Sequence, residues 1–124
     1  ALNPENLILL NNYSYYLALR KTNLKRAEEL ILIVLSKFPN IATYCDTYGW
    51  VLFQMGKYSL SEKELFKAVM YSNESSGEIL EHYGDVLFKI NKKDGALLFW
   101  KKAKEAGQSS KKLIQKISEN RFIE

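Results

Sequence analysis

Apolar residues recur along this chain at spacings of three and four, which places side chains on one face of an α-helix. Polar breaks, some containing glycine or proline, separate these stretches. The stretch DTYGWVLFQMGKY has the composition of a strand, but its apolar residues also fit the helical spacing. The chain is therefore predicted to be all-α, with helices over about residues 4–19, 24–37, 41–54, 59–71, 78–90, 93–106 and 111–122.

Local signals support several of these helix ends. Asn3 before Pro4 is suited to start the first helix, because proline fits the first turn, where no backbone N–H is needed. Pro39 is expected to end the second helix. Gly56 and Gly107 are suited to the left-handed conformation that often follows the end of a helix.

The predicted helices have apolar faces that we expect to be buried. Such faces drive helix packing in globular proteins more than intrinsic helix propensity does. They comprise Leu7, Leu10, Tyr13 and Leu17 in the first helix, Ala27, Leu30, Ile31, Val34 and Phe38 in the second, Leu60, Leu65, Phe66, Ala68 and Val69 in the fourth, and Leu113, Ile114, Ile117 and Phe122 in the last.

One motif occurs three times at steps of 35 residues. NNYSYYLALRKTN begins at residue 11, DTYGWVLFQMGKY at 46 and EHYGDVLFKINKK at 81. A period of 20–50 residues is typical of stacked repeats, each of which buries its apolar face against the next. Equivalent positions hold Leu10, Cys45 and Leu80; Tyr13, Tyr48 and Tyr83; Ser14, Gly49 and Gly84; and Leu17, Leu52 and Leu87.

The Ser/Gly/Gly position predicts a close crossing of two helices, because a larger side chain would push them apart. The following helix of each pair also offers a small residue, and then bulky and small residues alternate. These positions hold Ala27, Ser61 and Ala96, then Ile31, Leu65 and Trp100, then Val34, Ala68 and Ala103.

This arrangement resembles the tetratricopeptide repeat over about residues 5–107. The second copy carries the resemblance best, with Leu52, Gly56-Lys57-Tyr58, Leu65 and Ala68. The resemblance implies an α–α superhelix, a right-handed solenoid of three helix pairs plus a C-terminal capping helix. The implied organisation is a single domain over 1–124, with repeats at about 6–39, 41–73 and 76–107 and the capping helix at about 109–122.

The 35-residue step also fits the pentatricopeptide family, which binds single-stranded RNA one base per repeat. The pairing of small residues favours the tetratricopeptide family. The opening ALNPEN is similar to the end of a preceding repeat, so we expect a C-terminal part of a longer bacterial repeat protein. The tyrosine-rich helices are similar to those of bacterial secreted repeat proteins, which leaves the envelope or periplasm and the cytoplasm as alternative locations.

In that family the first helix of each pair lines a concave face, and here the resemblance implies a groove with aromatic and acidic ends. A partner side chain buried on one of the aromatic residues would contribute about 1.5–3 kcal/mol. The alternative is that Trp50 and Phe53 pack against the neighbouring repeat. The candidate partner-binding residues are Asn11, Tyr15, Asp46, Trp50, Phe53, Glu81, Asp85 and Phe88.

The chemistry of these positions narrows the class of partner. Some family members hold a C-terminal carboxylate with Lys, Arg and Asn at the same sites, and the acidic residues here would repel one. Nucleic acid is not expected either, because phosphates require Lys or Arg and the predicted groove has almost none. The sequence therefore predicts a protein or peptide partner with basic or aromatic side chains.

The sequence offers no catalytic motif. Cys45 aligns with leucines in the other copies, so it is interpreted as a small core residue. His82 has no His or Cys partner at metal-ligand spacing, and Asp46 and Asp85 recur because the repeat does. We find neither a P-loop nor a dinucleotide fingerprint, and we expect no enzyme activity, cofactor or metal.

The net charge of +4 is unevenly distributed. Residues 1–88 hold eight Lys or Arg against ten Asp or Glu, whereas residues 89–124 hold ten against four. We interpret the basic end as a solvated face, with nucleic-acid binding as a less favoured alternative. A second alternative is a structural or self-associating array, in which an N-terminal edge at Leu2, Leu7 and Leu10 docks on further repeats or on another copy.

Overall fold

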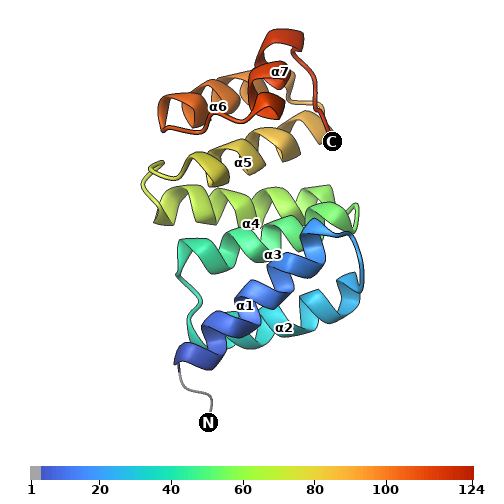
Figure 1. The fold of residues 1–124 in the computed structure, drawn as a ribbon, viewed down its shortest axis with the longest axis vertical. Helices are drawn as coiled ribbons and strands as arrows, with labels where there is room; N and C mark the ends of the chain where they lie inside the picture. The colour runs from blue at the N-terminus through green and yellow to red at the C-terminus, as the bar shows by residue number, and fades with distance from the viewer. Residues whose placement is uncertain (1–3) are drawn as a thin grey trace.

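The computed structural model describes residues 4–124, and over this range the chain is all-α, as predicted. The helices follow one another along the long axis of the molecule (Figure 1). None of those described is long and apolar enough to span a bilayer. Their bounds are α1 (Pro4–Leu19), α2 (Leu24–Lys37), α3 (Ala42–Gln54), α4 (Tyr58–Tyr71), α5 (Gly77–Lys89), α6 (Lys93–Glu105) and α7 (Lys111–Glu119).

The left-handed positions after the helices explain where several of them stop. Gly56 and Gly107 adopt φ angles of 79° and 106°, as their positions predicted. Asn91 takes the place of Gly56 in the third copy and adopts φ 69°, which asparagine tolerates better than most residues. The expected cap Asn3 lies outside the described residues.

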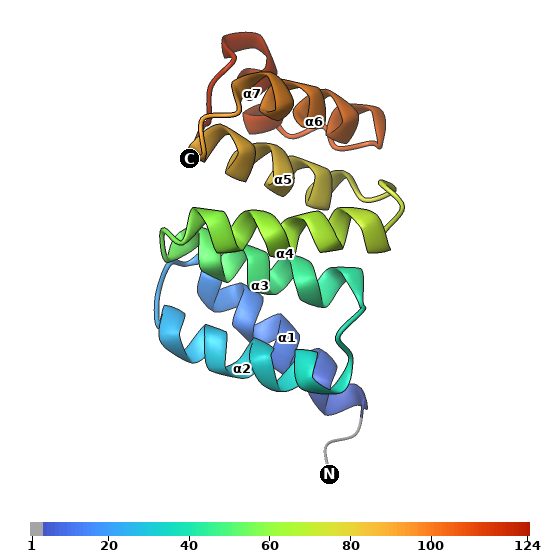
Figure 2. The same cartoon turned by 180° about the vertical axis from the view of Figure 1, so that it is seen from behind.

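The last helix ends three residues earlier than predicted. Ser110 begins it by accepting a 3.1 Å hydrogen bond from the Leu113 N–H. Asn120 then adopts a left-handed conformation (φ 54°, ψ 45°), so the helix stops after Glu119. Residues 121–124 consequently leave the helix, and the chain finishes beside α5 (Figures 1 and 2).

The helices pack in pairs, and the small repeated positions lie where the two helices of a pair meet. Ser14 Oγ of α1 donates to the Ala27 carbonyl of α2 over 2.8 Å. In the next pair the direction is reversed, because Ser61 Oγ of α4 donates to the Gly49 carbonyl of α3 over 2.7 Å. A single buried hydroxyl thus joins each of these two pairs.

The third pair has no hydroxyl at these positions and instead packs a tryptophan against a glycine. A Cβ added to Gly84 of α5 would lie 2.5 Å from Trp100 Cδ1 and 3.1 Å from the Ala96 carbonyl oxygen of α6. Trp100 is fully buried, so its ring occupies the space that the missing side chain leaves. The predicted close crossing is confirmed in all three pairs.

A tyrosine that recurs in each repeat contributes a hydrogen bond between successive pairs. The Tyr48 hydroxyl of α3 donates to Glu28 Oε2 of α2, and the Tyr83 hydroxyl of α5 donates to Glu62 Oε2 of α4. The third tyrosine, Tyr13 of α1, is 51% exposed because no described pair precedes it. Its predicted burial is therefore wrong.

Several other predicted core positions are also exposed. Leu60, Phe66 and Ile114 each stand beside a buried residue, and a step of one residue rotates a side chain by about 100° around the helix. Phe38 is exposed because it follows the end of α2. The remaining residues of the predicted faces are buried or half-buried.

Candidate functional site

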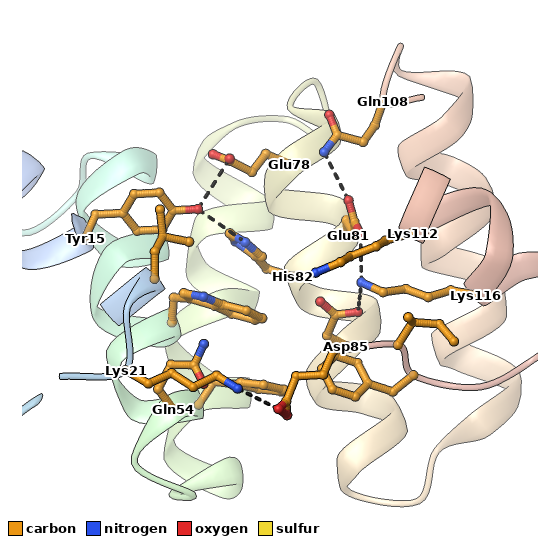
Figure 3. A pocket seen from close by; sticks show the side chains of 16 residues that line it. Tyr15, Lys21, Gln54, Glu78, Glu81, His82, Asp85, Gln108, Lys112 and Lys116 are labelled. Atoms are coloured by element: carbon orange, nitrogen blue, oxygen red, sulfur yellow. Dashed lines mark hydrogen bonds and ion pairs between the residues drawn. The ribbon is translucent and has the colours of Figure 1, made fainter. Parts of the chain in front are cut away.

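A cavity of about 370 Å³ lies between α1, α3, α5 and α7, which we call the central cavity (Figure 3). Its size is within the range of ligand-binding pockets. Five of the eight predicted partner-binding residues line it. They are Tyr15, Trp50, Phe53, Glu81 and Asp85. The structure does not place Asn11, Asp46 or Phe88 among its lining residues.

A row of stacked rings forms one wall of the central cavity. The Trp50 ring lies between His82, 4.0 Å away between centroids, and Phe53, 4.3 Å away, and is nearly parallel to both. Tyr15 continues the row beyond His82, at 6.2 Å. Both faces of Trp50 are therefore covered, one by Phe53 of its own helix and the other by His82 of the next repeat. The contact with His82 agrees with the alternative that Trp50 packs against the neighbouring repeat, whereas Phe53 packs on Phe122 after α7.

His82 of α5 connects all three repeats through a chain of polar contacts, which is buried at Asp46 of α3 and exposed where Tyr15 of α1 meets Glu78. Its Nδ1–H donates to Asp46 Oδ1 over 2.9 Å, and its Nε2 lies 3.5 Å from the Tyr15 hydroxyl, which donates to Glu78 Oε2. Burial alone would lower the pKa of His82, but Asp46, Asp85 and Glu78 outweigh it and raise that pKa above the ordinary value. The protonated ring is therefore favoured in the folded chain.

Lys116 of α7 enters the acidic end of the cavity and pairs with two carboxylates. Its Nζ lies 2.7 Å from Glu81 Oε2 and 2.8 Å from Asp85 Oδ1, and the lysine is only 3% exposed. Asp85 Oδ1 also accepts from Trp100 Nε1 over 3.0 Å, and Glu81 accepts from Gln108. Burial raises the pKa of Asp85 to about 6, although the Lys116 ammonium acts in the opposite direction.

Residues 121–124, which we call the tail, reach the aromatic end of the cavity. The Phe122 ring packs on Phe53 with 5.6 Å between centroids, and Lys89 Nζ lies 4.6 Å above the same ring. Glu124 Oε2 pairs with Lys21 Nζ over 2.6 Å, between residues 103 positions apart. The chain thus fills both ends of the central cavity with its own side chains.

The cavity keeps polar groups that the described residues do not use. Lys112 and Gln54 line it and make no hydrogen bond or ion pair within the described part of the chain. Leu19 also lines it and is exposed. Trp50 Nε1 is buried without a hydrogen-bond partner among the described residues. An apolar group and an anion can therefore both find contacts here.

The prediction that this groove holds almost no Lys or Arg is wrong, because Lys21, Lys112 and Lys116 line the cavity. Lys112 belongs to the basic end of the chain, which was interpreted as a solvated face, and it is exposed although it lines the cavity. Lys112 and Lys116 come from α7, outside the repeated motif. Lys21 lies in the α1–α2 turn, within the first copy of the motif, where the other copies have Gly56 and Asn91. The apolar stripe of α7 was the sequence signal that could have predicted the two lysines of that helix. Burial of the stripe requires α7 to pack on the last helix pair.

Comparison with known proteins agrees with this architecture. Over 82 residues, 66% of this chain, the sequence is 32% identical to a curated TPR repeat-containing protein of Pseudomonas aeruginosa, of which the match covers 14%. No family model matches the chain.

Several solved structures share the fold. The first TPR of Spaghetti (RPAP3), bound to the HSP90 peptide SRMEEVD, has a TM-score of 0.82 at 13% identity and covers 96% of this chain and 93% of its own. The Sgt2 TPR domain from Aspergillus fumigatus has a TM-score of 0.82 at 18% identity, with 97% and 79% covered. A type III secretion complex chain from Aeromonas hydrophila has a TM-score of 0.75 at 12% identity, with 95% and 77% covered. The repeated packing positions, the three helix pairs with a capping helix and these similarities identify the chain as a tetratricopeptide-repeat domain.

Proposed function

We propose that this chain is a protein-interaction module that binds a segment of a partner protein in the central cavity. The observation that carries the proposal is the cavity itself, which combines stacked aromatic rings with unused polar groups at Lys112 and Gln54. The similar RPAP3 domain is bound to a peptide, which supports the same use of the fold here. Non-catalytic binding is consistent with the TPR identity.

The structure changes what a partner would contact. The expected contacts between a partner's basic groups and Asp46, Glu81 or Asp85 stay a prediction, and here these carboxylates already pair with His82 and with Lys116. Lys112 makes no ion pair among the described residues and therefore favours a segment that brings a negative group. An apolar side chain of the same segment would contact Leu19, which is exposed beside Tyr15.

A peptide-display selection against the folded chain tests this proposal. Affinities of selected peptides are compared between the chain and its Lys112→Glu variant, with Lys25→Glu as a matched exposed control outside the cavity. We expect Lys112→Glu to weaken binding about tenfold, because it reverses a charge at the site, and Lys25→Glu to leave binding nearly unchanged. Equal effects of the two variants would show that the peptides bind elsewhere.

Self-association is a second candidate function, and one surface favours it. Ile8, Leu9, Tyr13 and Tyr16 are exposed on α1. The predicted edge was different, since Leu7 is buried, Leu10 is half-buried and Leu2 lies outside the described residues. Sedimentation equilibrium distinguishes this candidate, because an association through α1 would raise the mass with concentration and a Tyr13→Glu variant would remove the increase.

A further inference from the structure

Two parts of the chain after α6 contact the cavity, and α7 is held more strongly than the tail. Leu113 of α7 is fully buried, and Lys116 makes two buried ion pairs. The tail, residues 121–124, has two half-buried side chains, Phe122 and Ile123, and ion pairs at exposed side chains. Beyond Arg121 it makes no backbone hydrogen bond within the described residues. The tail can therefore open while α7 stays in place, since local stability follows buried contacts.

The position of Phe122 is suited to an aromatic side chain. The ring rests against Phe53 at an interplanar angle of 57°. Two ammonium groups stand over it, Lys89 Nζ at 4.6 Å and Lys116 Nζ at 5.3 Å from the ring centre. Cations over a ring face favour an aromatic group over an aliphatic one of similar size. This position is an aromatic subsite.

The position of Glu124 is suited to a carboxylate. Lys21 Nζ lies 2.6 Å from Glu124 Oε2. Hydrogen bonding and charge from Lys21, with further charge from Lys89 and Lys112, lower the pKa of the Glu124 carboxyl. Three lysines from three parts of the chain thus favour a negative charge at this point.

The tail is nevertheless easily exchanged. In the Lys21–Glu124 pair the side chains are 46% and 70% exposed, and such surface pairs contribute little to stability. A competing segment that supplies the same two groups would regain the same contacts. The tail is attached to α7 by the single left-handed turn at Asn120, so release requires little rearrangement elsewhere.

We propose that the tail occupies a peptide-binding subsite, and that the partner segment which replaces it carries an aromatic side chain followed two residues later by a carboxylate. This inference rests on the proposed function and specifies the partner chemistry and its regulation. The tail competes from within the chain, so a partner binds only as tightly as the fraction of open molecules allows. A segment that supplies the same groups as the tail can therefore displace it, whereas an unrelated segment cannot.

An NMR titration in trans tests the proposal. The acetylated peptide ENRFIE, residues 119–124, is added up to about 5 mM to the intact chain and to a chain ending at Asn120, since a tethered tail acts at millimolar effective concentration. We expect saturable amide shifts around Phe53 and Lys21 in the shortened chain, and binding roughly tenfold weaker in the intact chain. A peptide with alanine at the Phe122 position should not bind.

Charge reversal tests the carboxylate subsite. Lys21→Glu in the shortened chain should weaken the native peptide about two- to fivefold, the usual effect of an exposed ion pair, and a peptide with lysine at the Glu124 position should restore the loss. If the shortened chain does not fold, the Phe122→Ala, Glu124→Ala variant of the full chain replaces it.

Three results would overturn the inference. One is that the shortened chain folds but does not bind the peptide. Another is equal binding by the intact and shortened chains. The third is a dimer of the intact chain that is lost on removal of the tail, which would place the tail in a second copy. If the shortened chain binds a display-selected peptide at the central cavity but not ENRFIE, this inference fails and the proposed function stands.

Discussion

Lys116 Nζ lies 2.8 Å from Asp85 Oδ1, and both side chains are almost completely buried. This contact joins α7 to α5 across 31 residues of sequence and closes the acidic end of the central cavity. It is also linked to the core, because the same oxygen accepts from Trp100 Nε1. One lysine of the capping helix therefore neutralises a charge that the last helix pair buries.

Substitution Lys116→Met should destabilise the chain by about 3–5 kcal/mol, because it leaves two buried carboxylates without a cation. Urea denaturation followed by circular dichroism measures the effect. The matched control is Lys112→Met on the same helix, which makes no ion pair within the described chain and should change stability by less than about 0.5 kcal/mol. Similar losses in both variants would contradict the assigned role of Lys116.

The close crossing of α5 and α6 predicts opposite effects for one substitution at two glycines. Gly84→Ala should cost about 1–3 kcal/mol, because the new methyl group would meet Trp100, whose ring is fixed by Asp85. Gly95→Ala should be neutral or stabilising by up to about 1 kcal/mol, since its nearest neighbour is the movable end of Leu87 at 3.3 Å. Thermal melts of both variants check the prediction, which is wrong if both substitutions change the stability in the same direction.

His82 should make stability depend on pH. Its pKa is raised in the folded chain, so its contribution is fully present below the unfolded value of about 6.5 and is lost as pH rises through the folded value. Unfolding free energies of the chain and of His82→Gln are compared between pH 6 and pH 9. We expect the difference between them to shrink with rising pH, and parallel curves would exclude this role for the His82–Asp46 pair.

Two residues near the chain end should differ strongly in their effect on stability. Leu113→Ala removes a fully buried side chain and should cost about 2–5 kcal/mol. Phe122→Ala removes a half-buried ring of the tail and should cost less than about 1 kcal/mol if that ring is held as weakly as the structure indicates. Denaturant midpoints measured side by side decide this, and equal losses would mean that the tail is part of the core.

The sequence was sufficient to predict the helix pairs, because their contacts recur with the period of the chain. Small residues at Ser14, Gly49 and Gly84 indicated where helices cross, and the structure confirms each crossing. The alignment could not decide that Tyr13 is exposed while Tyr83 is buried, because that difference depends on the neighbouring pair and not on the residue.

The candidate site was predicted only in part for a related reason. Trp50 and Phe53 were placed on the correct helix, but the stacking of Trp50 between Phe53 and His82 depends on the rotation of side chains from two repeats. Lys116 and Phe122 reach the cavity from outside the aligned positions, so no comparison of repeats could place them there. The turn at Asn120, which directs the tail, also depends on a single backbone conformation.

The affinity of one display-selected, cavity-binding peptide, measured by calorimetry with and without residues 121–124, tests the central claim most directly. If the central cavity is a binding site that the tail shares, removal of the tail should tighten binding, by about tenfold when the tail is seated nine-tenths of the time. Lys112→Glu should weaken binding in both backgrounds. Equal affinities with and without the tail, together with no effect of Lys112→Glu, would contradict the account.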